Sequence, residues 1–455
     1  MELSLLQELP PGIEDSETLL SDLDELFRTG FARLSDEAGV HLQTLEAAFA
    51  GTPFAEALAD ALRAIAQHEF LEHHFAVVAL ARASLQGAQH DSLRAQACGA
   101  LGKTIPSSDA PTPSEEVVSE PQIELWCESI RQWLMELALT GFAHLDSETM
   151  AAFFQSLEEI QRDPRMMRHA ALLNGWLREM LAVHEADEIP LRRWVDMWTR
   201  AFVLSTATPD VPSNENGSGS LYILACELQQ HDVSASLCVH AYLVPQGSET
   251  KMLCRIRITT FKVDVIVGAE LRELFVGIAP KLLAALSEER VLELDAMPIT
   301  PTGDILWDDG RARLGESSAL LEAFPHANTL TSTPLAAADR MPAMLFDICY
   351  LDDYRIKDDN LFVGDAILPL AWHYVAETQD MPEASVRKST AMLAALRFDA
   401  GRWCVQPLSI VSRVKKLDVV MTQGRFTPGK GKKPKPALPL LQERASRLLR
   451  KKASS

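Results

Sequence analysis

The spacing of apolar residues divides the chain into a helical first half and a strand-rich second half. In the first half, apolar positions recur every three or four residues, as the sequence 19–27 illustrates, and this spacing predicts amphipathic helices. The first expected helix is capped by Asp15 or Ser16 and ends at Gly30. Further helices are expected at 36–50 and 54–85, and again at 122–140, 147–161, 165–184 and 191–204. Breaks are expected at Gly30, at Gly51-Thr52-Pro53 and at Asp163-Pro164.

After about residue 220 the pattern changes to β-branched and aromatic residues with partial alternation. Strands are predicted at 221–228, 235–244 and 252–267, and alternation of Arg255 and Arg257 with isoleucines gives the last of these a basic outer face. Further expected elements are hairpins at 304–314 and 396–411, a strand pair at 345–350 and 360–367, and helices at 269–286 and 384–396. The second half therefore reads as an α+β domain with mainly antiparallel strands.

A short repeat occurs within the helical half. Thr29-Gly30-Phe31-Ala32-Arg33-Leu34 returns as Thr140-Gly141-Phe142-Ala143-His144-Leu145. Each copy ends a predicted helix at its glycine and continues through an acidic step into another helix. This recurrence predicts a duplicated helical module. A repeat of this kind indicates that the helical half is built from two similar units.

Two stretches rich in proline, glycine and serine predict linkers because they contain few large apolar side chains to bury. The predicted fold class is a multidomain protein with duplicated all-α modules, an α+β domain and a disordered basic tail. The expected units are a first helical module at 1–102, a linker at 103–121, a second module at 122–206, a linker at 207–220, the α+β domain at 221–424 and the tail at 425–455.

Charge is distributed unevenly along the 455 residues. The whole chain carries −20, but the segment 413–455 has 13 basic residues against Asp418 and Glu443, a balance of +11 that leaves −31 for residues 1–412. An acidic body repels nucleic acid, whereas a basic tail attracts polyanions. No secretory signal or membrane-spanning run is apparent, and the seven scattered cysteines suit reduced, buried thiols. A cytoplasmic location is therefore expected.

Recognised catalytic motifs are absent from the sequence, which has no phosphate-binding loop, dinucleotide fingerprint or nucleophile elbow. We therefore assign no catalytic, cofactor-binding or metal-binding residue. The cluster His68–His74 does not have the spacing of a metalloprotease and reads as a polar helix face. The acidic pairs at 308–309, 352–353 and 358–359 are expected at solvated turns, although carboxylates on turns can also hold Mg²⁺.

The basic tail is the strongest candidate for an interaction site. Three functions compete for it, namely contact with nucleic-acid phosphates, docking on an acidic protein surface and binding to an anionic membrane, and a solubilising disordered end is the alternative to all three. Its candidate residues are Lys430, Lys432, Lys433, Lys435, Arg444, Arg447, Arg450, Lys451 and Lys452.

Two segments carry a resemblance to a group of bacterial proteins. The repeat at 29–34 and the hairpin Asp399-Ala400-Gly401-Arg402-Trp403 with Gln406-Pro407-Leu408-Ser409 resemble accessory proteins encoded beside a SWIM zinc finger protein, a MoxR-type AAA+ ATPase and a von Willebrand A-domain protein. The resemblance implies a scaffold or adaptor role beside an ATPase. The SWIM cysteine and histidine set and the ATPase loop are absent, and no catalytic residue carries over.

The sequence as a whole predicts a cytoplasmic, non-enzymatic scaffold or adaptor with protein partners, among them an AAA+ ATPase or a von Willebrand A-domain protein. One alternative is a metal-dependent enzyme with its site in the α+β domain, built on Asp352, Asp353, Asp358 or Asp359. The other is a nucleic-acid-associated protein that acts through its basic tail.

Overall fold

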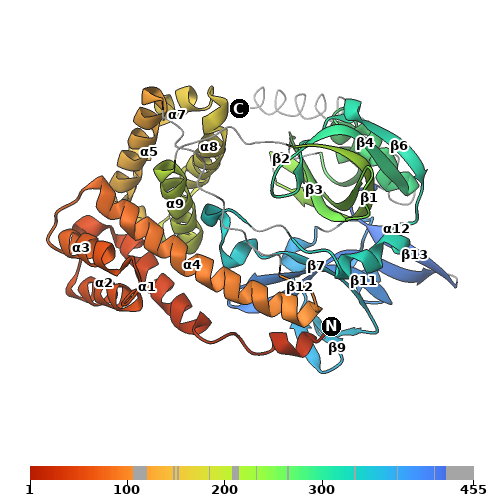
Figure 1. Ribbon diagram of the computed structural model, residues 1–455, viewed down its shortest axis with the longest axis horizontal. Coiled ribbons are helices and arrows are strands. Elements are labelled where there is room, and N and C mark those ends of the chain that lie inside the picture. The colour runs from red at the N-terminus through yellow and green to blue at the C-terminus, as the bar shows by residue number, and fades with distance from the viewer. Residues whose placement is uncertain are drawn as a thin grey trace, which may run out of the picture.

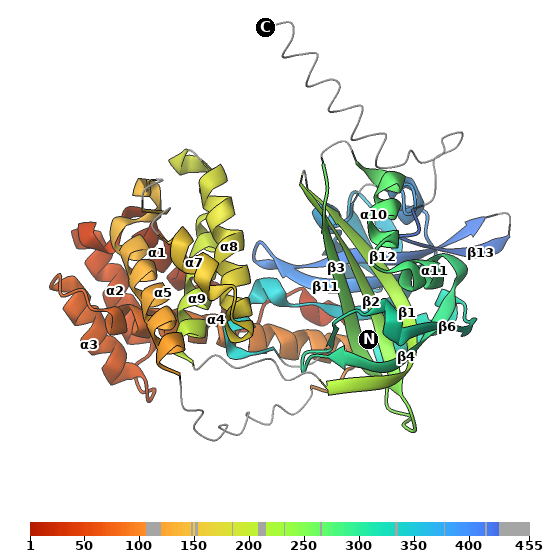
Figure 2. The ribbon, with the colours of Figure 1, turned by 90° about the horizontal axis from the view of Figure 1, so that it is seen from above.

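The N-terminal half of the protein is helical, and the C-terminal half is rich in mostly antiparallel strands (Figure 1). The two halves lie side by side in both views (Figure 2). The computed structural model describes residues 1–105, 120–146, 149–150, 153–183, 185–207, 215–231, 233–263, 266–332, 335–376, 378–414 and 416–426.

The helices of the first half enclose one continuous core that contains residues from both predicted modules. Phe27 from the first module contacts Phe142 and Trp198 from the second, with ring centroids 6.0 and 4.5 Å apart. The two segments therefore bury their apolar faces against each other. The helices are α1 (Ile13–Thr29), α2 (Asp36–Ala48), α3 (Ala55–Ala66), α4 (Glu72–Leu101), α5 (Pro121–Thr140), α7 (Phe154–Ile160), α8 (Met167–Ala182) and α9 (Leu191–Thr206).

The repeated glycines lie against each other where the ends of α1 and α5 meet. Gly30 and Gly141 have φ of 93° and 83°, a conformation that side chains disfavour. A Cβ atom on Gly30 would lie 2.5 Å from the carbonyl oxygen of Leu139, and one on Gly141 would lie 2.5 Å from the nitrogen of Gly30. The Arg33 guanidinium donates to the carbonyl of Thr140 at 2.6 Å. Backbone packing of this closeness requires glycine at both positions.

Helix α4 belongs to both halves of the molecule. Phe75 and Val78, near its start, are buried in the helical core. Leu93 and Leu101, near its end, are buried in a second core with Leu351 and other residues of the C-terminal sheets. In Figure 1 the helix runs from the helical half to the strands β7 and β12. One continuous helix therefore fixes the two halves relative to each other.

The first sheet of the C-terminal half closes on itself. Its order is β1-β2-β3-β5-β4-β6, and an additional pairing joins β1 to β4. The short helices α10 (Arg272–Val276) and α11 (Pro280–Glu288) contribute to its apolar core. The strands are β1 (Glu215–Gln230), β2 (Ser234–Pro245), β3 (Met252–Phe261), β4 (Arg290–Ile299), β5 (Asp304–Ile305) and β6 (Ala312–Ser317).

The second large sheet, of order β13-β12-β11-β7, is covered on both faces. Leu393 and Ala395 of β11 pack into the core of the first sheet, whereas Met392 and Leu396 face the core that contains the end of α4. A three-stranded sheet, β10-β9-β8, lies beside it. The remaining elements are α12 (Leu320–Ala323), α13 (Glu383–Val386), β7 (Asp347–Asp352), β8 (Arg355–Lys357), β9 (Asn360–Val363), β10 (Ala366–Pro369), β11 (Ala391–Asp399), β12 (Arg402–Val414) and β13 (Leu417–Thr422).

Several local predictions were wrong. The helix expected at 54–85 is two helices, because His68, with a φ of 61°, terminates the first of them and α4 begins at Glu72. The helix expected at 384–396 is a single turn followed by β11, whose residues are apolar without alternation because both faces are buried. Strand β1 begins at Glu215, inside the stretch predicted as the linker 207–220.

Pairings between short strands were also wrong in two places. The predicted hairpin at 304–314 does not form, because β5 pairs with β3 and β4 while β6 pairs with β4. Strand β7 pairs with β11, and β9 pairs with β8 and β10, so the strand pair at 345–350 and 360–367 is absent. The hairpin at 396–411 is confirmed as β11 and β12. No helix in the described part of the chain has the length and apolar character needed to cross a membrane.

Replacement of either repeated glycine is expected to destabilise the fold. Gly30→Ala and Gly141→Ala should each lower the free energy of unfolding by about 2–4 kcal/mol, because an alanine there is conformationally strained and also clashes with backbone. The measurement is urea unfolding followed by circular dichroism.

Gly102→Ala is the matched control, since Gly102 also has a positive φ of 67° but a Cβ atom there meets nothing within 4 Å. This control should lose about 1–2 kcal/mol, the cost of strain alone. Equal losses in all three variants would contradict the close packing of Gly30 on Gly141.

Candidate functional site

A cavity of about 290 Å³ lies where the helical half meets the first sheet. Helices α4 and α9, strands β2 and β3, and residues between 335 and 347 contribute to its wall. The charged residues and histidines that line it are His90, Arg94, Arg200, His240, Arg255, Arg257, Asp304, Asp339 and Asp347.

Local periodicity explains how these side chains come together. Arg255 and Arg257 are two residues apart on β3, so they lie on the face opposite the buried Ile256 and Ile258. His240 on β2 is directly opposite Arg255 in the ladder. The basic outer face predicted for this strand is thus confirmed, and it forms one wall of the cavity.

Two of the four cavity arginines form ion pairs with aspartates. Arg200 lies 2.7 Å from Oδ1 of Asp339, and Arg255 lies 2.6 Å from Oδ1 of Asp304. Arg94 donates to the backbone carbonyl of Ser332. The contacts of Arg94 and Arg200 join the helical half to the segment before β7, whereas that of Arg255 lies inside the first sheet, between β3 and β5. The two ion pairs neutralise part of the positive charge.

Two guanidinium groups retain donors for a ligand. Nε of Arg200 is buried and has no hydrogen-bond partner within the described residues. Arg257 is exposed at the cavity wall, and no hydrogen bond or ion pair of its side chain is found in the described part of the chain. Guanidinium donors of this kind bind carboxylates and phosphates. The cavity therefore has the chemistry of an anion site.

His240 also belongs to a buried polar cluster with Glu227 and Cys238. Oε1 of Glu227 is 2.5 Å from Nε2 of His240, and Sγ of Cys238 is 3.7 Å from the same nitrogen. Cys238 pairs with Glu227 across the β1–β2 ladder, which places the three side chains together. Within the described residues, this is the only group of three His, Cys, Asp or Glu side chains whose ligand atoms are close enough to share an ion.

The ionisation of this cluster is strongly coupled. Burial acts to raise the pKa of Glu227, but the hydrogen bond and charge of His240, together with Arg397 and Gln406, outweigh it and bring the pKa down to about 2. Burial acts to lower the pKa of His240, yet Cys238 and Glu227 raise it to about 9. Burial also acts to raise the pKa of Cys238, and the neighbouring imidazolium lowers it overall.

Residues of the second sheet hold the cluster in place. The Gln406 amide donates to Oε2 of Glu227 at 2.7 Å, and Nε of Arg397 donates to the Gln406 oxygen at 2.5 Å. The Arg397 guanidinium lies over the Phe346 ring at 4.8 Å, and Phe346 also stacks on His240 with centroids 4.7 Å apart. The orientation of Glu227 and His240 is therefore set by contacts from both sheets.

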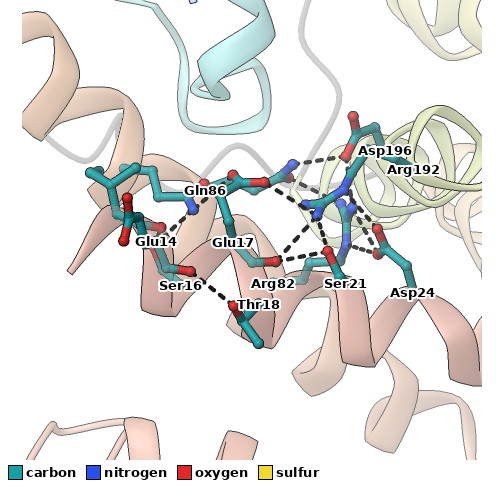
Figure 3. Close-up of polar contacts among 12 residues, drawn as sticks. Glu14, Ser16, Glu17, Thr18, Ser21, Asp24, Arg82, Gln86, Arg192 and Asp196 are labelled. Carbon is teal, nitrogen blue, oxygen red and sulfur yellow. Dashed lines mark hydrogen bonds and ion pairs between the residues drawn. The ribbon is translucent and has the colours of Figure 1, made fainter. Parts of the chain in front are cut away.

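A second buried polar network lies inside the helical half (Figure 3). The Arg82 side chain of α4 is fully buried, and its Nη2 lies 3.0 Å from Asp24 of α1 and 2.8 Å from Asp196 of α9. Its Nη1 donates to Gln86 and Thr199 at 3.1 Å. Arg192 lies 2.8 Å from the other oxygen of Asp24. Arg82 thus connects α1 and α4, from the first predicted module, to α9, from the second.

The charges of this network compensate one another. Burial raises the pKa of Asp24 to about 6, although the nearby charges of Arg82 and Arg192 act to lower it. Burial acts in the opposite sense on Arg82, whose pKa is nevertheless raised by Asp24 and Asp196. The network has few donors to spare, so its role is to position helices rather than to bind a ligand.

The candidate residues predicted from the sequence do not come together in one site. The nine basic residues of the tail lie outside the described residues. His68 and Glu72 do not share a helix face, because the turn at 67–71 separates them, and this corrects the predicted polar helix face. Asp353, Asp358 and Asp359 adopt positive φ, which agrees with turns, and none of them joins the group around His240.

The cluster of Glu227, Cys238 and His240 was missed because its partners are on different strands. The alternation of Cys238 and His240 placed both on one face of a predicted strand, but Glu227 joins them only through the register of β1 against β2. All seven cysteines are free and buried, as the sequence predicted.

Comparison with known proteins adds no relative. No family model, curated protein or solved structure matches the chain.

Loss of the central arginine should destabilise the helical half. Arg82→Met is expected to cost about 3–5 kcal/mol in free energy of unfolding, because it leaves the buried Asp24 and the half-buried Asp196 without their shared partner. Urea unfolding at neutral pH measures this cost.

The control is Arg63→Met, which removes an exposed ion pair with Asp60 within α3. A change of less than about 1 kcal/mol is expected there. If Arg82→Met were as mild as this control, the proposed role of Arg82 in positioning the helices would be wrong.

Proposed function

We propose that the protein is a non-enzymatic adaptor that binds a small anionic ligand in the cavity between its two halves. The observation that carries this proposal is the presence of unmatched guanidinium donors, on Arg200 and Arg257, in the wall of one cavity. Arg200 is on α9 and Arg257 is on β3, so a ligand that contacts both connects the helical half to the first sheet.

The ligand class follows from the size and charge of the cavity. At about 290 Å³ it lies at the lower end of the range of small-molecule sites. Four arginines line it against Asp304, Asp339 and Asp347, which leaves an excess of positive charge. A phosphate group or a small carboxylate satisfies both constraints because it accepts paired hydrogen bonds from guanidinium groups.

The adaptor role extends the sequence prediction. In both copies of the repeat, a helix ends at glycine and a short 3₁₀ turn follows, at Phe31–Arg33 and Phe142–His144. This parallel supports the duplication of a helical module. Protein partners, an AAA+ ATPase or a von Willebrand A-domain protein among them, remain a proposal based on the resemblance of the repeat and the hairpin.

Ligand binding is expected to raise thermal stability. Inorganic phosphate or succinate should increase the melting temperature of the full-length protein, because a ligand that binds only the folded state stabilises it by mass action. Arg257→Gln should weaken binding in isothermal titration calorimetry by about tenfold or more, the effect of losing a charged hydrogen bond.

Arg63→Gln, which replaces another exposed arginine, on α3 and away from the cavity, is the control and should bind as the parent does. The absence of any shift with both anions, or equal affinity of Arg257→Gln and the parent, would contradict the proposed anion site. A pull-down with and without phosphate tests the adaptor role, and recovery of no stable protein partner in either condition would count against it.

A further inference from the structure

Three potential metal ligands converge on one point in the first sheet. Glu227, Cys238 and His240 offer one ligand atom each, and these atoms all lie within 4.8 Å of one another. All three residues are buried, with 5, 2 and 3% of their surface exposed. An arrangement of this kind is costly to bury unless its charges are balanced.

The contacts at His240 are unusual because two groups share one nitrogen. Glu227 and Cys238 both approach Nε2, at 2.5 and 3.7 Å. A single ring N–H directs its proton to one acceptor, so it cannot form a full hydrogen bond to a carboxylate oxygen and a sulfur together. This geometry also differs from a catalytic triad, in which nucleophile and acid contact opposite nitrogens of the imidazole.

A divalent metal ion in place of that proton can be bound by Glu227, Cys238 and His240 at the same time. Zn²⁺ bonds to thiolate sulfur at about 2.3 Å and to imidazole nitrogen at about 2.0 Å, so two such ligands in a tetrahedron lie roughly 3.5 Å apart. The observed Cys238–His240 separation of 3.7 Å agrees with this spacing. The Glu227 oxygen has to move away from Nε2 by about 1 Å to reach a tetrahedral ligand position.

The charge balance of the site and the contacts that orient its ligands also favour a bound cation. A carboxylate, a thiolate and a divalent ion sum to zero charge, so a neutral unit is buried. The second oxygen of Glu227 accepts a hydrogen bond from Gln406 at 2.7 Å, which is the kind of outer contact that orients a metal-binding carboxylate. Phe346 stacks on the His240 ring and fixes its orientation.

We propose that Glu227, Cys238 and His240 together bind one divalent metal ion of the zinc class. The mixed sulfur, nitrogen and oxygen donors suit Zn²⁺ or Co²⁺ and do not suit Mg²⁺ or Ca²⁺, which prefer oxygen ligands alone. The three protein ligands leave a fourth position for water. The proposal does not depend on the anion site, because the metal ligands and the unmatched arginine donors are different residues.

The test is a Co²⁺ titration of the full-length protein after removal of metal with a chelator. Binding of one ion per chain should produce an intense near-ultraviolet charge-transfer absorption from a cobalt–thiolate bond, and Zn²⁺ should displace it. Cys238→Ser should abolish the absorption, while His240→Gln and Glu227→Gln should weaken Co²⁺ binding by at least tenfold.

Cys127→Ser is the matched control, because Cys127 is a free, buried thiol on α5 in the helical half. It should retain the full absorption. X-ray absorption of the zinc-loaded parent supplies a measurement that needs no variant, with one sulfur neighbour at about 2.3 Å expected. Absence of bound Co²⁺ and Zn²⁺ in the parent, or an unchanged absorption in Cys238→Ser, would overturn the proposal.

Discussion

The arrangement of the molecule depends on one helix that is buried in two separate cores. At 30 residues, α4 is about 45 Å long, which is enough to cross a small domain. Its first turns pack through Phe75 into the helical core and its last turns pack through Leu93 into the sheets. Because a continuous helix does not bend freely, the position of the helical half relative to the sheets follows from the length and the straightness of this one element.

Polar groups mark the places where elements distant in sequence meet. Arg82 lies in the first half of α4 and joins it to α1 and α9 through carboxylates. Arg200 of α9 pairs with Asp339 of the C-terminal half, and Arg255 pairs with Asp304 between strands β3 and β5. Burial of such groups costs free energy unless each has a partner, so wrong pairings of helices and sheets are penalised more than an apolar contact would penalise them. The apolar cores supply stability, and the ion pairs select one arrangement of the elements.

Much of the secondary structure was predictable from local pattern, and most of the site was not. Alternation along 252–267 predicted a strand with a basic face, which the structure shows as the shorter β3 at Met252–Phe261, and glycine after an apolar helix predicted the ends of α1 and α5. The first residues of β11, up to residue 396, were predicted as helix because a strand that is buried on both faces shows no alternation of apolar and polar residues. The cavity is lined by residues of α4, α9 and β3, and the cluster at His240 depends on the register of β1 against β2. Neither could be predicted from one continuous segment of the sequence.

The contact between Gly30 and Gly141 has a consequence for how the sequence can change over time. A Cβ atom on either glycine would meet backbone atoms of the opposite segment, and those atoms are present whatever residue stands there. Replacement of one glycine does not become tolerable when the other is replaced, because the backbone atoms that cause each clash remain in place. Lineages that carry this crossing are therefore held at both sites, and divergence is expected to proceed through the surrounding side chains while the paired glycines stay.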